Sequence, residues 1–126
     1  MARVLVVDDD PDTLRTLRRA LQRFGHEVGE AAEGRAALAT LDREEWSLVI
    51  TDVNMPGMDG IELIQAMMER RPEVPVIAIS GGGWLPKEHL LADAGLMGAV
   101  TTLVKPVDLA DLRRAVDSAL SPGAAG

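Results

Sequence analysis

The sequence predicts an α/β domain in which a parallel sheet is covered by helices on both faces. Short apolar runs rich in Val, Ile and Leu alternate with longer segments in which apolar residues recur every three or four positions. The short runs are apolar at consecutive positions, as expected for strands that are buried on both faces. Strands that alternate with helices favour parallel pairing, and 126 residues suit one domain.

The first half of the chain is predicted to hold three strands and two helices. Its opening apolar run stops at Asp8, which marks the end of a buried strand. Pro11 suits the first turn of the helix that follows, and Gly25 suits its end. The elements expected here are a strand at 4–7, a helix from Pro11 to Gly25, a weak strand at 26–29, a helix at 34–42 and a strand at 48–51.

The second half is predicted to hold two strands and three helices. Met67 and Met68 lie on the apolar stripe of a helix that Pro72 closes, and we expect both in the core. The elements expected here are a helix at 61–71, a strand at 74–79, a short helix at 87–94, a strand at 102–104 and a helix at 109–120. We expect the domain to span residues 1–121, with a flexible tail at 122–126.

Composition and charge exclude several classes of function. A net charge of −7 argues against direct binding to nucleic acid, because that needs a basic face. The sequence has no Cys for disulfides or thiolate metal sites, and His26 and His89 are too few for a His-rich metal cluster. No apolar stretch suits a signal peptide or a membrane span, so we expect a cytoplasmic protein with no membrane partner.

Polar residues follow four of the five predicted strands. Asp8 and Asp9 follow the first strand, Asp52 the third, Ser80 the fourth and Lys105 the fifth. In open parallel sheets, ligands bind beyond the carboxyl ends of the strands. Each residue alone is equally well explained as the point where a strand leaves the core, but the set together indicates a site.

The three carboxylates at this edge predict a site for a divalent cation. The first and third strands are expected to be neighbours, so Asp8, Asp9 and Asp52 would repel one another unless a proton or a cation joins them. Mg²⁺ prefers such oxygen ligands, and Mn²⁺ is the alternative. Beside that cation, Lys105 and Ser80 suit a transferring phosphoryl group, with Asp52 as its nucleophile.

Other acidic or phosphate-binding motifs fail on spacing. A calcium loop that begins at Asp8 would need Gly where Thr13 stands and Glu where Arg19 stands. The Asp-x-Asp-x-Thr/Val motif of haloacid-dehalogenase-type phosphatases does not occur after the first strand. The chain also has neither a P-loop nor a dinucleotide-binding glycine motif.

Four motifs occur in the order found in one known family. They are Val6-Val7-Asp8-Asp9, Thr51-Asp52-Val53-Asn54-Met55-Pro56-Gly57-Met58-Asp59-Gly60, Ser80 and Val104-Lys105-Pro106. On these motifs the chain resembles the receiver domains of two-component response regulators, over residues 3–121. The resemblance implies a flavodoxin-like fold with a five-stranded sheet of order 2-1-3-4-5 and the site where the strand order reverses.

The resemblance also implies the metal ligands and the phosphoryl acceptor. Asp52 would accept a phosphoryl group from a phosphohistidine donor. Asp9 would bind Mg²⁺ directly, together with Asp52 and the backbone carbonyl of Asn54, whereas Asp8 would act mainly through water. Asp10 lies outside the family pattern, and we expect it to be a solvated charge at the start of a helix.

Phosphorylation is expected to act as a switch between two states. Ser80, Gly81 and Lys105 would contact the phosphoryl group, and the change would reach the face formed by the fourth helix, the last strand and the last helix. The family often has a cis bond after this lysine. Thr102 departs from the family, which usually has Tyr or Phe there, and Val107 replaces a frequent Phe. How the switch works without the aromatic ring stays open.

Two surfaces are candidates for partner contacts. Arg15, Arg18 and Arg19 are either a solvated basic face or a docking surface for a sensor histidine kinase or a histidine phosphotransferase. Trp84 follows three glycines, and either packs on the fourth helix or serves as a partner anchor. We expect a monomer or weak dimer that acts on a downstream protein target.

Three functions stay open at this point. The first is a phosphorylation-controlled interaction module, either stand-alone or part of a larger regulator or hybrid kinase. Such a module would catalyse only its own phosphorylation and the hydrolysis of its acyl phosphate. The second is a metal-dependent phosphatase that uses Asp52. The third is a receiver-like domain that takes no phosphate, which only Thr102 supports.

Overall fold

Five parallel strands form the centre of the molecule, in the order β2-β1-β3-β4-β5. The computed structural model describes residues 2–53, 60–80 and 101–121. Every pair of neighbouring strands is parallel. The strands are β1 (Arg3–Val7), β2 (Glu27–Ala31), β3 (Leu48–Asp52), β4 (Val76–Ser80) and β5 (Thr101–Val104). The predicted fold class and the strand order implied by the resemblance are therefore confirmed.

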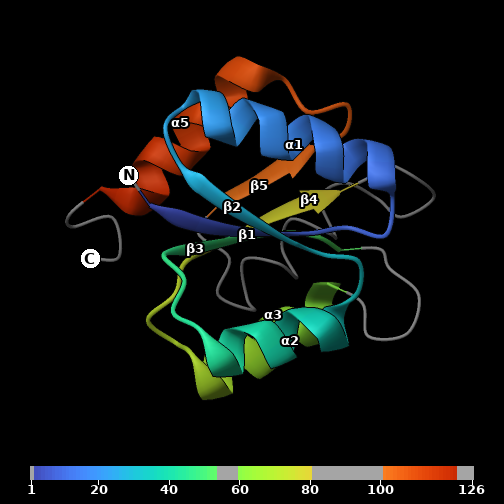
Figure 1. Cartoon of the computed structure of the whole chain (residues 1–126), viewed down its shortest axis with the longest axis vertical. Helices are drawn as coiled ribbons and strands as arrows, with labels where there is room; N and C mark the ends of the chain where they lie inside the picture. The colour runs from blue at the N-terminus through green and yellow to red at the C-terminus, as the bar shows by residue number, and fades with distance from the viewer. Residues whose placement is uncertain (1, 54–59, 81–100, 122–126) are drawn as a thin grey trace.

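Helices cover both faces of this sheet (Figure 1). The described helices are α1 (Pro11–Arg23), α2 (Gly34–Arg43), α3 (Gly60–Arg70) and α5 (Leu109–Leu120). In Figure 1, α1 and α5 lie on one face, and α2 and α3 lie on the other. The helix predicted at 87–94 and the tail predicted at 122–126 lie outside the described residues. None of the described helices is both long and apolar enough to cross a bilayer.

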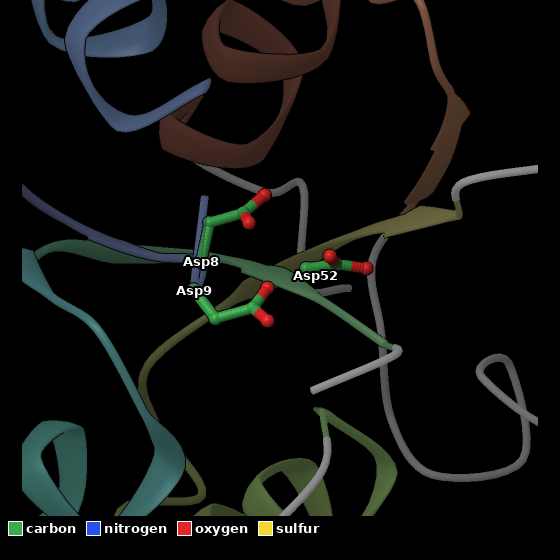
Figure 2. Close-up of side chains that lie close together, drawn as sticks. All are labelled: Asp8, Asp9 and Asp52. Carbon is green, nitrogen blue, oxygen red and sulfur yellow. The ribbon is translucent and has the colours of Figure 1, made fainter. Parts of the chain in front are cut away.

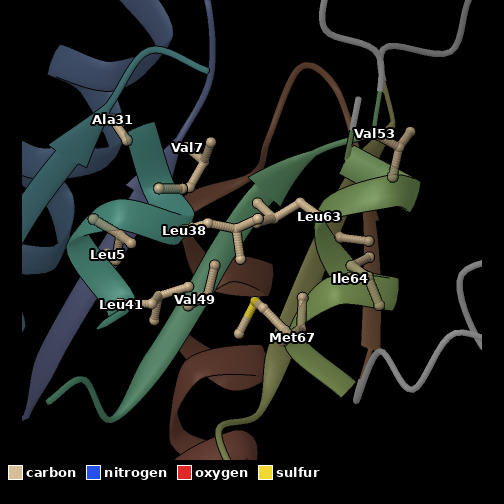
Figure 3. Packing of buried hydrophobic residues seen from close by; sticks show 13 residues of the cluster. Leu5, Val7, Ala31, Leu38, Leu41, Val49, Val53, Leu63, Ile64 and Met67 are labelled. Carbon is tan, nitrogen blue, oxygen red and sulfur yellow. The ribbon is translucent and has the colours of Figure 1, made fainter. Parts of the chain in front are cut away.

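Alternation of side chains along the strands builds one hydrophobic cluster on each face. Val4 and Val6 pack in the cluster of α1 and α5, whereas Leu5 and Val7 pack in the cluster of α2 and α3. Figure 3 shows the second cluster, which consists of Leu5, Val7, Ala31, Ala37, Leu38, Leu41, Val49, Val53, Leu63, Ile64, Met67, Val76 and Ala78. Burial on both faces explains why these strands are apolar at consecutive positions.

Helix ends follow the sequence signals. The side chain of Asp10 caps α1, and Asp108 caps α5 in the same way. Helix α1 ends at Arg23 with Phe24 as its C-cap, and Gly25 follows with a φ of 95°, so Gly25 ends the helix as predicted. The turn into β2 follows, and in it the N–H of His26 donates to the carbonyl of Leu21 at 3.0 Å.

The prediction for the two adjacent methionines of α3 is half wrong. Met67 is 1% exposed and lies in the core, whereas Met68 is 48% exposed. Neighbouring positions of a helix point about 100° apart, so only one of them faces the sheet.

Trp46 closes the amino end of the sheet. The Trp46 ring packs against the cluster of α2 and α3, and the guanidinium of Arg3 lies 4.4 Å from its centroid. Gly29 of β2 leaves room for the ring, because a Cβ there would lie 2.4 Å from Trp46 Cη2. Among the described residues, nothing accepts a hydrogen bond from the buried Nε1 of Trp46. Packing rather than hydrogen bonding therefore holds the ring.

Candidate metal and phosphoryl-acceptor site

The register of β1 and β3 brings two aspartates face to face. It pairs Val7 with Thr51, so the next residues on the two strands are Asp8 and Asp52. Neighbouring strands lie about 4.8 Å apart. Asp8 continues the alternation of Val4 and Val6, so its side chain leaves the sheet on the face of α1 and α5.

Asp9 completes a group of three carboxylates at this edge. Figure 2 shows the side chains of Asp8 and Asp9 at the end of β1 and that of Asp52 at the end of β3. One carboxylate oxygen of each residue lies within 4.8 Å of those of the other two. Asp8 is 1% exposed and Asp52 is 5% exposed, whereas Asp9 is open to solvent. The group is thus buried on one side and accessible on the other.

Lys105 reaches across the sheet edge to both buried carboxylates. Its Nζ lies 2.9 Å from Asp8 Oδ2 and 3.2 Å from Asp52 Oδ2, to which it donates a hydrogen bond. Burial lowers the pKa of Lys105, but the contact with Asp8 and the charge of Asp52 outweigh it, so its pKa lies above the usual 10.5. The ammonium is therefore charged at neutral pH.

The ends of β4 and β5 are linked through backbone next to this ion pair. The N–H of Lys105 donates to the carbonyl of Ser80 at 2.8 Å, and the bond between Lys105 and Pro106 is cis. Ser80 is 5% exposed. Thr102 pairs with Ala78 in the sheet and is half-buried.

The residues present fit a hard divalent cation. Three carboxylates gather here and, among the described residues, Lys105 pairs with two of them, so this group carries an excess of negative charge. Mg²⁺ binds oxygen ligands at about 2.0–2.1 Å and keeps several waters, which the exposed side at Asp9 allows. Oxygen ligands 4.8 Å apart or less need only small shifts to share such an ion. Asn54 and Gly81 lie outside the described residues. Metal binding by the carbonyl of Asn54 and phosphoryl contact by Gly81 therefore stay predictions.

Gly60 is a feature of the site that the sequence motif contains but does not explain. A Cβ on Gly60 would lie 2.1 Å from the carbonyl oxygen of Asp52 and 2.5 Å from the Cα of Val53. The first residue of α3 thus packs directly on the backbone that carries the Asp52 carboxylate. Only glycine permits this approach.

The predicted docking residues lie on α1. Arg15 pairs with Asp12 at 3.3 Å, Arg18 pairs with Glu30 of β2 at 3.3 Å, and Arg19 is exposed.

A pocket of about 490 Å³ lies between α1 and the segment after β5. Its lining residues are Asp12, Thr13, Thr16, Leu17, Lys105, Pro106 and Val107. Trp84 and His89 lie outside the described residues, and His26 accepts a hydrogen bond from the N–H of Ala2 away from the site.

Solved structures with this fold include a chemotaxis protein and a metal complex. Vibrio cholerae CheY4 is 32% identical, with a TM-score of 0.86 over 95% of this chain and 99% of that one. Thermotoga maritima TrrA, solved in complex with Mg²⁺-BeF, is 29% identical, with a TM-score of 0.85 over 95% of this chain and all of that one (100%).

Comparisons of sequence agree with the structural ones. The transcriptional regulatory protein GlrR of Escherichia coli is 37% identical over 98% of this chain and 27% of its own length. The response regulator protein FleR of Pseudomonas aeruginosa is 40% identical over 85% of this chain and 22% of its own length. This chain thus spans about a quarter of each of these relatives. The sequence model of the response regulator receiver domain family matches residues 4–117, and the chain belongs to that family.

Proposed function

We propose that this chain accepts a phosphoryl group on Asp52 in a Mg²⁺-dependent reaction and thereby switches a partner-binding surface. The donor is the phosphohistidine of a sensor histidine kinase or a histidine phosphotransferase. One observation carries the proposal: the carboxylate of Asp52 lies among Asp8, Asp9 and the ammonium of Lys105. This arrangement supplies a nucleophile, cation ligands and a phosphate-binding charge at one strand end.

The transfer step uses residues of this chain as nucleophile and charge partner. A carboxylate oxygen of Asp52 attacks the phosphorus of the phosphohistidine, and an O–P bond forms while the P–N bond breaks. The electron pair of the P–N bond stays on the imidazole nitrogen of the donor. Lys105 pairs with the charge on the transferred group, and the Ser80 hydroxyl donates a hydrogen bond to one of its oxygens.

Asp9 and Asp52 would hold the metal ion directly, as would the backbone carbonyl of Asn54, and Asp8 would act mainly through water. A bound Mg²⁺ supplies neutralisation of charge on the phosphoryl oxygens. The three carboxylates also repel a phosphoryl group when no metal ion is bound, because Lys105 alone does not neutralise them, and we therefore expect the reaction to depend on the metal. The Mg²⁺-BeF complex of TrrA, a relative with the same fold, supports this assignment.

Labelling with acetyl phosphate and Mg²⁺ tests the proposal. Wild type should take up one phosphoryl group, Asp52→Asn should take up none, and EDTA should abolish the reaction. Asp42→Asn is the matched control, because Asp42 is an exposed aspartate of α2 that pairs with Arg70. Equal incorporation into wild type and Asp52→Asn would overturn the assignment. Steady turnover of a small phosphoester would instead favour the phosphatase alternative, since we propose no enzymatic activity beyond self-phosphorylation and hydrolysis of the acyl phosphate.

The link between Ser80 and Lys105 supports the switch. Both side chains are expected to move toward the phosphoryl group, and the hydrogen bond between their backbones joins the ends of β4 and β5. A shift at the site would therefore move both strand ends together. Thr102, three residues before Lys105, has no aromatic ring that could flip, so we propose that the signal passes through the backbone or through another group.

The output is proposed to be a protein contact in the cytoplasm. The relatives GlrR and FleR are regulators about four times as long as this segment, so the activity of their remaining parts is not assigned to this chain. The net charge of −7 supports a protein target rather than direct contact with nucleic acid. Arg18 and Arg19 are proposed donor contacts; charge reversal at both that leaves phosphotransfer from the cognate kinase unchanged would count against this.

A further inference from the structure

Asp10 connects the first turn of α1 to the carboxylate of Asp8. Its Oδ1 accepts a hydrogen bond from the N–H of Asp12 at 3.1 Å, and its Oδ2 accepts one from the Thr13 hydroxyl at 2.8 Å. Its own N–H donates to Asp8 Oδ1 at 2.9 Å. The extended backbone of Asp10, with φ −93° and ψ 113°, makes these contacts at the same time. The helix cap and the candidate site are therefore parts of one hydrogen-bond chain.

These hydrogen bonds determine how the Asp8 carboxylate is oriented. One oxygen of Asp8 accepts from Asp10, and the other faces Lys105 Nζ at 2.9 Å. Because Asp8 is 1% exposed, bulk water cannot replace either partner. Only Asp9 lies between Asp8 and Asp10, so the direction in which Asp9 leaves β1 depends on the same two fixed neighbours.

We propose that Asp10 is a positioning residue for the divalent-cation site. By capping α1, it fixes the N–H that orients Asp8 and limits where the Asp9 carboxylate can lie. Asp10 itself does not bind the ion. The inference rests on the proposed function, because it takes Asp8 and Asp9 as the residues that hold the cation. It assigns a role to an aspartate that the family motif leaves out.

A Mg²⁺ titration followed by NMR amide shifts tests this role. Asp10→Ala removes the cap and should bind Mg²⁺ about 5–10-fold more weakly, near the lower end of the effects known for residues that orient metal ligands. Asp10→Ser keeps a capping oxygen without the charge and should bind within about twofold of wild type.

The matched control is Asp108→Ala. Asp108 caps α5 through the N–H of Asp111 at 3.0 Å, so this variant loses an equivalent helix cap on another element. Its melting temperature should fall about as much as that of Asp10→Ala, while Mg²⁺ binding stays unchanged. This comparison separates loss of helix stability from loss of ligand orientation.

Each result decides the proposal. If Asp10→Ala binds Mg²⁺ as tightly as wild type, the proposal is overturned. It is also overturned if Asp10→Ser loses as much affinity as Asp10→Ala, because the effect would then come from the lost charge and not from the lost cap. If Asp108→Ala lost as much Mg²⁺ affinity as Asp10→Ala, the loss would be a general effect of reduced stability, and the proposal would fail. If the wild-type chain binds no Mg²⁺, the proposed metal site fails, and this inference fails with it.

Discussion

At each end of the sheet, within the described residues, one basic side chain pairs with two carboxylates. At the amino end, Arg3 lies 3.2 Å from Glu27 and 2.9 Å from Glu44, and all three side chains are at least 39% exposed. At the carboxyl end, Lys105 lies 2.9 Å from Asp8 and 3.2 Å from Asp52, whose side chains are 1% and 6% exposed. The pairing of charges is alike at the two ends, but the carboxyl end also holds Asp9 and its ion pairs are far more buried.

Burial determines whether such a group of charges can serve a function. Exposed charges are solvated by water and screened by salt, so the pairs of Arg3 contribute little beyond local order. Buried carboxylates depend on their partner, since an unpaired buried charge is strongly unfavourable. The electrostatic energy of Asp8 and Asp52 therefore depends strongly on which cation or phosphoryl group binds beside them. The electrostatic energy of the exposed pairs at the amino end does not.

The largest effect is expected from Gly60→Ala at the carboxyl end. The new Cβ would meet the backbone of Asp52 at 2.1 Å, and backbone cannot yield as a side chain can. The free energy of unfolding should fall by about 3 kcal/mol or more, as measured by urea denaturation, and labelling of Asp52 should fall with it. Gln65→Ala, at an exposed position of the same helix, is the control, with an expected change below about 0.5 kcal/mol. Wild-type stability in Gly60→Ala would mean that α3 can move away from β3 at little cost.

Replacing the buried cation should have the next largest effect. Lys105→Met leaves Asp8 and Asp52 facing each other, and we expect a loss of about 2 kcal/mol in EDTA. Removing one partner of a fully buried pair costs about 3–5 kcal/mol, and Lys105 is partly exposed. Added Mg²⁺ should restore part of the loss, because it can take over the balancing charge. A variant as stable as wild type in EDTA would show that water already screens the two carboxylates.

The same ion pair predicts a loss of stability at alkaline pH. The pKa of Lys105 is raised in the folded state, so its stabilising contribution is complete below about pH 10.5 and is lost as pH rises through the raised pKa. The chain has no Tyr or Cys, and Lys87 is the only other lysine, so few groups titrate in this range. Urea denaturation against pH should show the decrease in wild type and a weaker one in Lys105→Met. If the free energy of unfolding fell equally with pH in wild type and in Lys105→Met, groups other than Lys105 would cause the decrease.

At the amino end, Gly29→Ala should cost less than Gly60→Ala. The new Cβ would meet Cη2 of Trp46 at 2.4 Å, but a side-chain ring can shift. We expect a loss of about 1–2 kcal/mol with unchanged labelling of Asp52. In a Trp46→Leu background the same substitution should cost less, which a double-mutant cycle would measure. Additive effects of the two substitutions would mean that Gly29 does not serve to seat the ring.

The smallest effect is expected from Arg3→Gln. It removes the two exposed ion pairs and the contact with the Trp46 ring, and the melting temperature should fall by about 2 °C or less. Mg²⁺ should not alter this difference. A change as large as that of Lys105→Met would remove the distinction between the two ends.

The fold was predictable because burial on both faces leaves a simple pattern. Consecutive apolar residues in short runs gave four of the five strands within two residues of their observed ends, and even the weak strand at 26–29 corresponds to β2. The acidic group was also predictable, because the carboxyl ends of neighbouring parallel strands must meet. Asp8 and Asp52 are one register step beyond Val7 and Thr51.

What the sequence did not predict depends on distances across the structure. Nothing in the spacing of Lys105 shows that its ammonium reaches Asp8 on the far side of β4 and β3, and the motif around Gly60 does not show what the glycine touches. Met68 was misplaced because helical periodicity alone does not fix which of two adjacent apolar residues faces the sheet. The cap formed by Asp10 had a visible signal, a helix-capping residue directly before Pro11, but its contact with Asp8 did not.

The position of Trp46 has a spectroscopic consequence. The chain contains two tryptophans, Trp46 and Trp84. Trp46 packs on the hydrophobic cluster at the amino end of the sheet, opposite the acidic group. In a Trp84→Phe variant, all indole emission would come from Trp46. That emission would report whether the chain is folded while staying silent to the chemistry at Asp52, and so would provide an internal reference for every titration of the site.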